Sequence, residues 1–150
     1  LRHRPSELFF PEASRRDVGI IVRVPLASGL LSGKFTPNTT FREGDHRHFN
    51  IEGKAFDRGE TFAGLDLELG TRVVNELKEA LPDNEPLAVW AIKWILMFQE
   101  VSCVIPGASR VEQLNQNLHT SEIPGLKAEQ MQRVREIYDE HVRPVVHQRW

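Results

Sequence analysis

The chain has 150 residues, a formal net charge of −2, 40% hydrophobic residues and 27% charged residues, a composition typical of one soluble globular domain. No basic run indicates a nucleic acid or a membrane surface as partner, and no apolar stretch approaches the ~20 residues of a membrane span. The single cysteine excludes an internal disulfide. The first residues lack the apolar core of a signal peptide, so we expect a cytoplasmic protein. The sequence begins with Leu1 rather than Met, which indicates a piece of a longer chain.

The first third of the chain predicts one helix, one strand and a long irregular segment. We expect a helix over residues 6–17 with Ser6 as its N-cap. Residues 19–24 are short and β-branched, which predicts a buried strand ended by Pro25. Residues 36–64 are polar and carry scattered glycines, a pattern typical of a functional lid or of disorder.

The remainder alternates between helix and strand. Residues 65–81 carry a helical apolar stripe, and residues 86–99 are apolar nearly all round, which predicts a buried helix. Residues 101–105 predict a second short strand, and residues 109–118 and 127–142 predict two more helices.

Alternating elements of this kind favour an α/β fold with a parallel sheet and crossover helices. Two strands cannot close a barrel, and they leave sheet edges open and a core unfinished. The pattern therefore predicts part of a larger α/β fold.

The first predicted strand leads directly into PLASGLLSGKF, residues 25–35. Small residues let backbone N–H groups approach a phosphate closely, and Lys34 adds a positive charge. The alternative interpretation is a tight turn with a solvated lysine.

The second predicted strand leads into PGASRVEQL, residues 106–114. Ser109 and Glu112 have the spacing of a capping box, and a helix start presents free N–H groups to an anion. Arg110 could grip a phosphate with its planar guanidinium. A purely structural cap remains the alternative, and the two interpretations are compatible because a capped helix start is still an anion site.

The segments VPLASGLLSGKF and VIPGASRVEQLNQNL resemble the two cofactor signatures of aldo-keto reductases, and the ending VRPVVHQRW resembles the tail of one branch of that family. The resemblance covers essentially the whole chain. It implies that residues 1–150 form a single segment, the C-terminal half of a (β/α)8 TIM barrel with barrel strands 7 and 8 and their helices. Phosphate sites in such barrels frequently lie in the loops after these two strands.

The resemblance also implies which residues hold NADPH. Those expected around the pyrophosphate and its neighbouring ribose are Pro25, Leu26, Ser28, Gly29, Ser32 and Lys34. Gly107 would let the backbone approach the ligand.

The second signature implies contacts with the adenosine end of NADPH. Ser109 and Arg110 would bind the 2′-phosphate that distinguishes NADPH from NADH, because arginine pairs well with a phosphate dianion. Gln113 would lie close by, and Gln116 and Asn117 would contact the adenine.

Arg23 stands where the family commonly has an aromatic or other planar residue against the nicotinamide. A guanidinium is planar, so we hypothesise that Arg23 packs against the nicotinamide face. The alternative is an arginine at the surface or at the end of the barrel.

The catalytic Asp, Tyr, Lys and His of the family come from earlier barrel strands, and nothing in this sequence matches them. The sole tyrosine, Tyr138, is expected to be a packing residue. The resemblance therefore implies the cofactor-binding half of an enzyme that reduces small aldehydes or ketones to alcohols. Alternatives are a non-catalytic nucleotide-binding regulator of the same fold and an inactive fragment that self-associates through open barrel edges.

Other residues suggest weaker interpretations. Asp45, His46 and His48 do not have the spacing of a metal site, and we expect the segment around them to order the long loop. Trp90 and Trp94 lie four apart and predict core packing, and Cys103 is expected to be buried in its strand.

Overall fold

A computed structural model describes residues 1–149 of the chain. Trp150, the last residue of the segment that resembles a family tail, lies outside the described residues. The long elements are α1 (Arg4–Arg15), β1 (Ile20–Arg23), α3 (Leu67–Ala80), α4 (Leu87–Leu96), β2 (Val101–Ile105), α5 (Val111–His119) and α6 (Ala128–Ile137). A π-helical turn, Tyr138–Val142, continues α6 into α7 (Arg143–Val146). Each long element predicted from the sequence is present, with ends that differ by a few residues.

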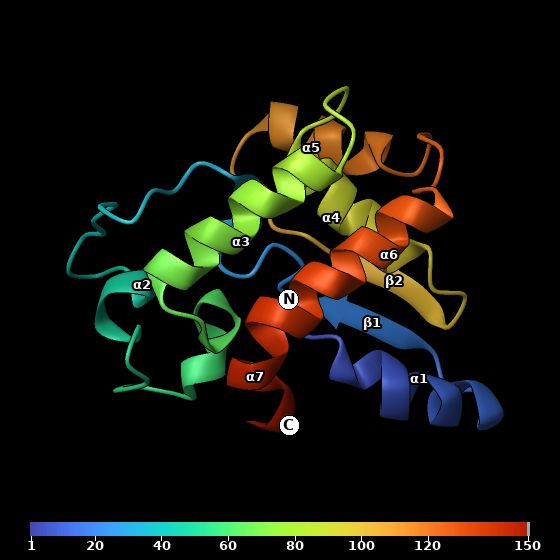
Figure 1. Ribbon diagram of the computed structural model, residues 1–150, viewed down its shortest axis with the longest axis horizontal. Helices are drawn as coiled ribbons and strands as arrows, with labels where there is room; N and C mark the ends of the chain where they lie inside the picture. Colours follow the sequence, from blue (N-terminus) through green and yellow to red (C-terminus); the bar gives the residue numbers. More distant parts are fainter. Residues whose placement is uncertain (150) are drawn as a thin grey trace.

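β1 and β2 pair in parallel, with Ile20 opposite Val101 and Arg23 opposite Ile105. A register irregularity lies between Ile20 and Ile21. The chain between the two strands includes α3 and α4, which makes the connection a helical crossover (Figure 1). The parallel sheet predicted from the alternation of elements is confirmed, as a pair of strands.

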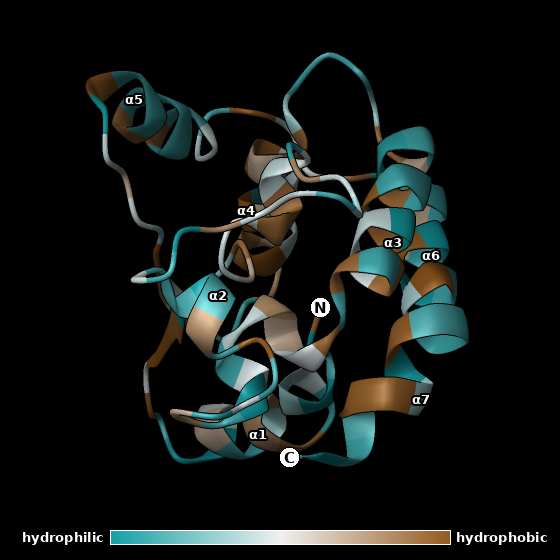
Figure 2. Cartoon of the chain, turned by 90° about the vertical axis from the view of Figure 1, so that its left-hand side faces the viewer, coloured by the Kyte–Doolittle hydropathy of each residue, from teal (hydrophilic) through white to brown (hydrophobic). Residues whose placement is uncertain are grey.

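The main core lies between the helices. α3 begins at Asp66, whose side chain accepts a hydrogen bond of 2.7 Å from the Leu69 N–H. α3 and α6 lie side by side (Figures 1 and 2). Residues from both helices, from the loop after β1, from the segment before α3 and from the C-terminal turns form this core, including Leu30, Leu31, Phe62, Val73, Val74, Ile137 and Val142.

The two strands are less buried than the sequence predicts. Ile20 is buried against Phe10 of α1, but Ile21 is 66% exposed and Ile105 is 55% exposed. Cys103 is exposed as well, so its predicted burial is wrong. Each of the two strands has one neighbouring strand among the described residues.

The start of α1 also differs from its prediction. The helix begins at Arg4 with His3 at the N-cap position, and Ser6 lies inside the first turn. There its hydroxyl donates a 2.7 Å hydrogen bond back to the His3 carbonyl. Pro5 suits the first helical turn, which explains why the helix starts before Ser6.

The segment predicted to be irregular contains short helices. These are α2 (His46–Phe49) and two 3-10 helices, Arg58–Glu60 and Phe62–Gly64. Asp45 and Asp57 cap the first two by accepting backbone N–H groups. No helix in residues 1–149 is long and apolar enough to cross a membrane.

Candidate functional site

The two glycine-containing loops leave the sheet at the same edge. Because β1 and β2 are parallel and Arg23 pairs with Ile105, the carboxyl ends of both strands lie side by side. The loops that begin at Val24 and Pro106 therefore start next to each other. In open parallel sheets and in barrels, ligands bind at this carboxyl edge.

The loop after β1 has an unusual backbone. Val24, Ala27 and Ser28 have φ values of 51°, 48° and 57°, followed by Gly29 at 89°. Left-handed φ is rare for a non-glycine residue and rarest for a β-branched one such as Val24. Strained backbone of this kind clusters at functional sites, and buried Leu30 anchors the loop in the core.

The far end of this loop turns towards α3. Lys78 of α3 donates a 2.7 Å hydrogen bond from Nζ to the Gly33 carbonyl. Ser32 lies in the 3-10 helix Leu30–Ser32, and Lys34 is exposed. The structure therefore brings Pro25 to Gly29 to the strand edge and ties the residues around Gly33 to α3.

The loop after β2 presents Ser109 and Arg110 to solvent. The predicted capping box between Ser109 and Glu112 is wrong, because Arg110 holds the N-cap position of α5. Gln113 instead accepts two hydrogen bonds at Oε1, from the Ser109 N–H at 2.8 Å and from its hydroxyl at 3.0 Å. A helix that starts one residue later than expected places Gln113, rather than Glu112, within reach of Ser109.

The other predicted residues of this loop and of α5 differ in accessibility. A Cβ added at Gly107 would meet no atom within 4 Å, so the surrounding protein leaves this backbone open. Gln116 is exposed on α5. Asn117 has a buried Nδ2 without a hydrogen-bond partner among residues 1–149. Arg110 likewise has no ion-pair partner among the described residues.

Glu60 joins two of the predicted site residues. Its carboxylate forms an ion pair with the Arg23 guanidinium, and its backbone carbonyl accepts a 3.0 Å hydrogen bond from the Ser28 hydroxyl. Glu60 closes the 3-10 helix Arg58–Glu60, which Asp57 caps. Glu60 could not be predicted as a site residue from the sequence, because a glutamate in a polar loop carries no local signal for a partner 37 residues away.

A second cluster lies over the glycine turn. Arg47 forms an ion pair with Asp45 at 2.5 Å, and its guanidinium lies over the rings of Phe35 and Phe41. Hydrogen bonds from Arg47 lower the pKa of Asp45 to about 2. A Cβ at Gly29 would lie 3.4 Å from Phe35 and 3.6 Å from Arg47. Asp45 and Arg47 thus order this segment beside the glycine turn, and its place over a bound cofactor or substrate stays a prediction.

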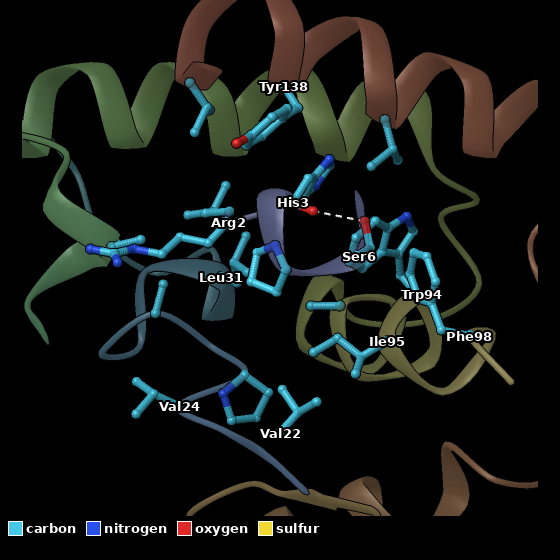
Figure 3. Close-up of a pocket in the computed structure, with 18 of the residues that line it drawn as sticks. Arg2, His3, Ser6, Val22, Val24, Leu31, Trp94, Ile95, Phe98 and Tyr138 are labelled. Atoms are coloured by element: carbon cyan, nitrogen blue, oxygen red, sulfur yellow. Dashed lines mark hydrogen bonds between the residues drawn. The ribbon is translucent and has the colours of Figure 1, made fainter. Parts of the chain in front are cut away.

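An apolar cavity of about 640 Å³ lies between α1, β1, α4 and the C-terminal helices. Figure 3 shows Val22, Val24, Leu31 and Ile95 around it, with His3 beside Tyr138 at one end. Arg23 and Glu60 also line it, but Ser109 and Arg110 do not. The cavity is therefore distinct from the loop after β2.

The aromatic residues at this end of the cavity are packing residues. The His3 ring stacks on Tyr138 at 3.8 Å and on Trp94 at 4.5 Å, and burial lowers the pKa of His3 well below its usual value. Tyr138 is buried and its hydroxyl lies 2.9 Å from His147 Nδ1. The predicted packing roles of Tyr138 and Trp90 are confirmed. No group of three metal-ligating side chains occurs within residues 1–149.

Comparisons with known proteins identify the family. The family model described as "Aldo/keto reductase family" matches residues 1–139. The chain is 35% identical over 101 residues to L-glyceraldehyde 3-phosphate reductase of Escherichia coli, covering 67% of this chain and 28% of that protein. It is 31% identical over 124 residues to a probable voltage-gated potassium channel subunit beta of Oryza sativa, covering 81% of this chain and 35% of that protein.

Solved structures give the same result. The holo form of an aldo-keto reductase from Bacillus halodurans matches with a TM-score of 0.59 and 28% identity, over 94% of this chain and 41% of that chain. A glycerol dehydrogenase from Gluconobacter oxydans shares the fold with a TM-score of 0.69 and 22% identity, over 92% of this chain and 39% of that chain. The chain thus spans less than half the length of these proteins, whose shared fold is an α/β barrel. It belongs to the aldo/keto reductase family of oxidoreductases.

Proposed function

We propose that this chain holds NADPH for an oxidoreductase that reduces small aldehydes or ketones to alcohols, and that β1 and β2 correspond to barrel strands 7 and 8. The observation that carries the proposal is the parallel register of Arg23 with Ile105, which starts both cofactor-like loops at one sheet edge. Phosphate sites of (β/α)8 barrels are frequently built by the loops after strands 7 and 8.

The chemistry of the loop after β2 fits the 2′-phosphate of NADPH. Ser109 and Arg110 are adjacent and exposed, and they stand at the start of the nine-residue helix α5. The first N–H groups of a helix have no partner within the helix, and its dipole favours an anion there. Asn117 lies on the same helix, and we assign it to the adenine.

The loop after β1 fits the other end of the cofactor. Its left-handed residues Val24, Ala27, Ser28 and Gly29 form a tight turn at the strand edge. We place the pyrophosphate against this turn, beside Ser28 and Gly29, and the nicotinamide against Arg23. When bound, NADPH supplies the hydride for carbonyl reduction. The residues of this chain bind and orient the cofactor.

The proton donor for reduction lies outside this set. A general acid must reach the carbonyl oxygen, but Tyr138 is 3% exposed and its hydroxyl contacts His147. We therefore propose that the catalytic Asp, Tyr, Lys and His of the family come from other strands of the complete barrel. The similarity to a reductase of a phosphorylated aldehyde supports a carbonyl substrate.

The test compares NADPH and NADH binding in the full-length protein and in Arg110→Gln. Hydrogen bonds to charged groups contribute about 1.5–3 kcal/mol, so we expect NADPH affinity to fall by about 10- to 100-fold. NADH affinity should change little, because NADH lacks the 2′-phosphate. The matched control is Arg72→Gln, an exposed arginine on α3. Equal losses for both cofactors, or none for either, would contradict the proposed role of Arg110.

A regulatory function is the second candidate, because the chain resembles a potassium channel subunit beta over 81% of its length. The same nucleotide site would then report the cofactor state without rapid turnover. A panel of aldehydes and ketones, assayed by NADPH absorbance, separates the two candidates. Tight NADPH binding without turnover favours the regulator, and turnover favours the reductase.

A further inference from the structure

Glu60 contacts the last residue of β1 and a residue of the loop that follows it. Its carboxylate pairs with Arg23, the last residue of β1, and its backbone carbonyl accepts the Ser28 hydroxyl at 3.0 Å. Arg23 and Glu60 are 64% and 37% exposed, so their ion pair adds little to stability. The pair instead orients the Arg23 side chain and changes the net charge at the end of β1.

Hydrogen bonds within residues 50–61 hold Glu60 in position. Asp57 accepts the Gly59 N–H at 2.7 Å and starts the short helix that ends at Glu60. Thr61, the next residue, is buried and accepts a hydrogen bond from the buried Asn50 amide. These hydrogen bonds therefore hold the Glu60 carboxylate at the end of β1.

Charge is the property that distinguishes the two states of the nicotinamide. The ring of NADP⁺ carries one positive charge, and the ring of NADPH carries none. An unpaired arginine beside the ring would disfavour the oxidised form, whereas an arginine paired with a carboxylate would present almost no net charge. The Arg23–Glu60 ion pair contains one positive and one negative charge, so its net charge is close to zero.

We propose that Glu60 is a positioning residue that orients Arg23 at the nicotinamide and cancels its charge, and thereby sets the relative affinity for NADP⁺ and NADPH. This inference rests on the proposed cofactor site. It assigns a role to Glu60, which lies in the long segment before α3 and contacts Arg23 and Ser28 rather than Ser109 and Arg110.

The substitution Glu60→Gln isolates this role. It keeps the backbone carbonyl that accepts the Ser28 hydroxyl, and it removes only the negative charge beside Arg23. We expect the ratio of the NADP⁺ dissociation constant to the NADPH dissociation constant to rise about fivefold, the effect of two unit charges ~4 Å apart in a water-like dielectric. Isothermal titration calorimetry with each nucleotide measures the ratio in the full-length protein.

Two more variants give the charge balance a signature that a structural defect does not share. Arg23→Gln leaves Glu60 unbalanced, so the same ratio should fall below that of the wild type. The double variant removes both charges, and its ratio should return close to the wild-type value. Glu52→Gln is the matched control, because Glu52 is an exposed glutamate of the same segment, paired with Lys54 at 2.7 Å.

The outcomes separate this inference from the proposed function. If the wild type binds neither nucleotide, the proposed cofactor site is wrong and the role of Glu60 is wrong with it. If the wild type binds both, but Glu60→Gln leaves the ratio unchanged or shifts it in the same direction as Arg23→Gln, only the role of Glu60 is overturned. Opposite shifts with restoration in the double variant establish the charge balance.

Discussion

Asn50 is a fully buried amide that organises the segment before Glu60. Its Nδ2 donates to the Asp57 carbonyl at 3.3 Å and to the Thr61 hydroxyl at 3.2 Å. Its Oδ1 accepts the N–H groups of Ala55 at 3.0 Å and Phe56 at 2.8 Å. One side chain therefore supplies the hydrogen bonds that a regular element would otherwise supply to this turn.

We predict that Asn50→Ala lowers the free energy of unfolding by about 2–4 kcal/mol, because two backbone N–H groups and the buried Thr61 hydroxyl lose a partner together. Urea denaturation of the wild type and the variant measures the loss. Asn38→Ala, at an exposed loop position, serves as control and should stay within about 0.5 kcal/mol. A loss below about 1 kcal/mol for Asn50→Ala would mean that water replaces the amide readily.

Single residues also show which contacts could not be predicted from the sequence. The glycines and small residues of the loop after β1 mark its turn, where Gly29 has a left-handed backbone. The partners of Ser109 and Arg23 could not be predicted, because Gln113 replaces Glu112 through a shift of one residue and Glu60 lies in a distant loop. Local patterns identify candidate groups, whereas the pairing between them depends on the fold.

At the scale of elements, α3 and the loop after β1 meet at Gly70. A Cβ at this position would lie 2.8 Å from Leu30 Cδ2, and Leu30 is 1% exposed. Replacement of a helical glycine by alanine normally gains about 0.8–1.0 kcal/mol. Here that gain competes with an overpacking cost of about 1–3 kcal/mol, so the crowded contact should dominate.

We therefore predict that Gly70→Ala destabilises the protein by about 1 kcal/mol, despite its better helix propensity. Asn75→Ala, on an exposed face of the same helix, is the control and should be neutral or slightly stabilising. A double variant that combines Gly70→Ala with Leu30→Ala should show favourable coupling in thermal unfolding, since the smaller side chain makes room. Stabilisation by Gly70→Ala alone would contradict the close packing of these two elements.

The C-terminal end of α5 is held by a histidine between two glutamates. His119 Nε2 lies 2.9 Å from Glu85 Oε1, and Nδ1 lies 3.2 Å from Glu122 Oε2. The hydrogen bonds to Glu85 and then to Glu122 raise the pKa of His119. A raised folded-state pKa means that the protonated ring stabilises the fold below about pH 6.5, the unfolded value, and that this contribution is lost as the pH rises through the folded-state pKa.

His119→Gln should therefore lower the Tm at about pH 5.5 and leave it nearly unchanged at about pH 8.5. His48→Gln, an exposed histidine on α2, is the control for the loss of a histidine. Differential scanning fluorimetry across this pH range measures both variants. An equal loss of Tm at the two pH values would show that His119 acts through packing rather than through charge.

The positions of the helices and strands could largely be predicted from the sequence, but the exposure of their side chains could not. β2 has the predicted bounds, Val101–Ile105, because β-branched residues between a helix and Pro106 leave few alternatives. The same apolar residues predicted burial, yet Ile21 and Ile105 are exposed. Apolar residues in a strand predict that one of its faces packs against another element. The sequence of the strand does not identify that element.

At the scale of the whole molecule, apolar surface remains uncovered on several elements. Figure 2 shows α5 standing apart from the layer of α3 and α6, and α5 has no buried residue. The large exposed apolar side chains on α1, the strands and α5 are Leu8, Phe9, Ile21, Ile105, Val111, Leu114 and Leu118. Exposed strands and contiguous apolar faces of this kind promote association.

We predict that residues 1–150, produced alone, self-associate in a concentration-dependent manner, because association removes this surface from water. Analytical ultracentrifugation over a range of concentrations measures the effect. Substitution of Val111, Leu114 and Leu118 by glutamine should weaken association, since these side chains form one stripe along α5. The control replaces Glu112, Asn115 and Gln116, which are exposed on the same helix, by alanine and should leave association unchanged or strengthened. If the chain is instead a monomer that melts cooperatively at every concentration, the uncovered faces are compatible with a stable fold, and NADPH binding by this segment alone becomes directly measurable.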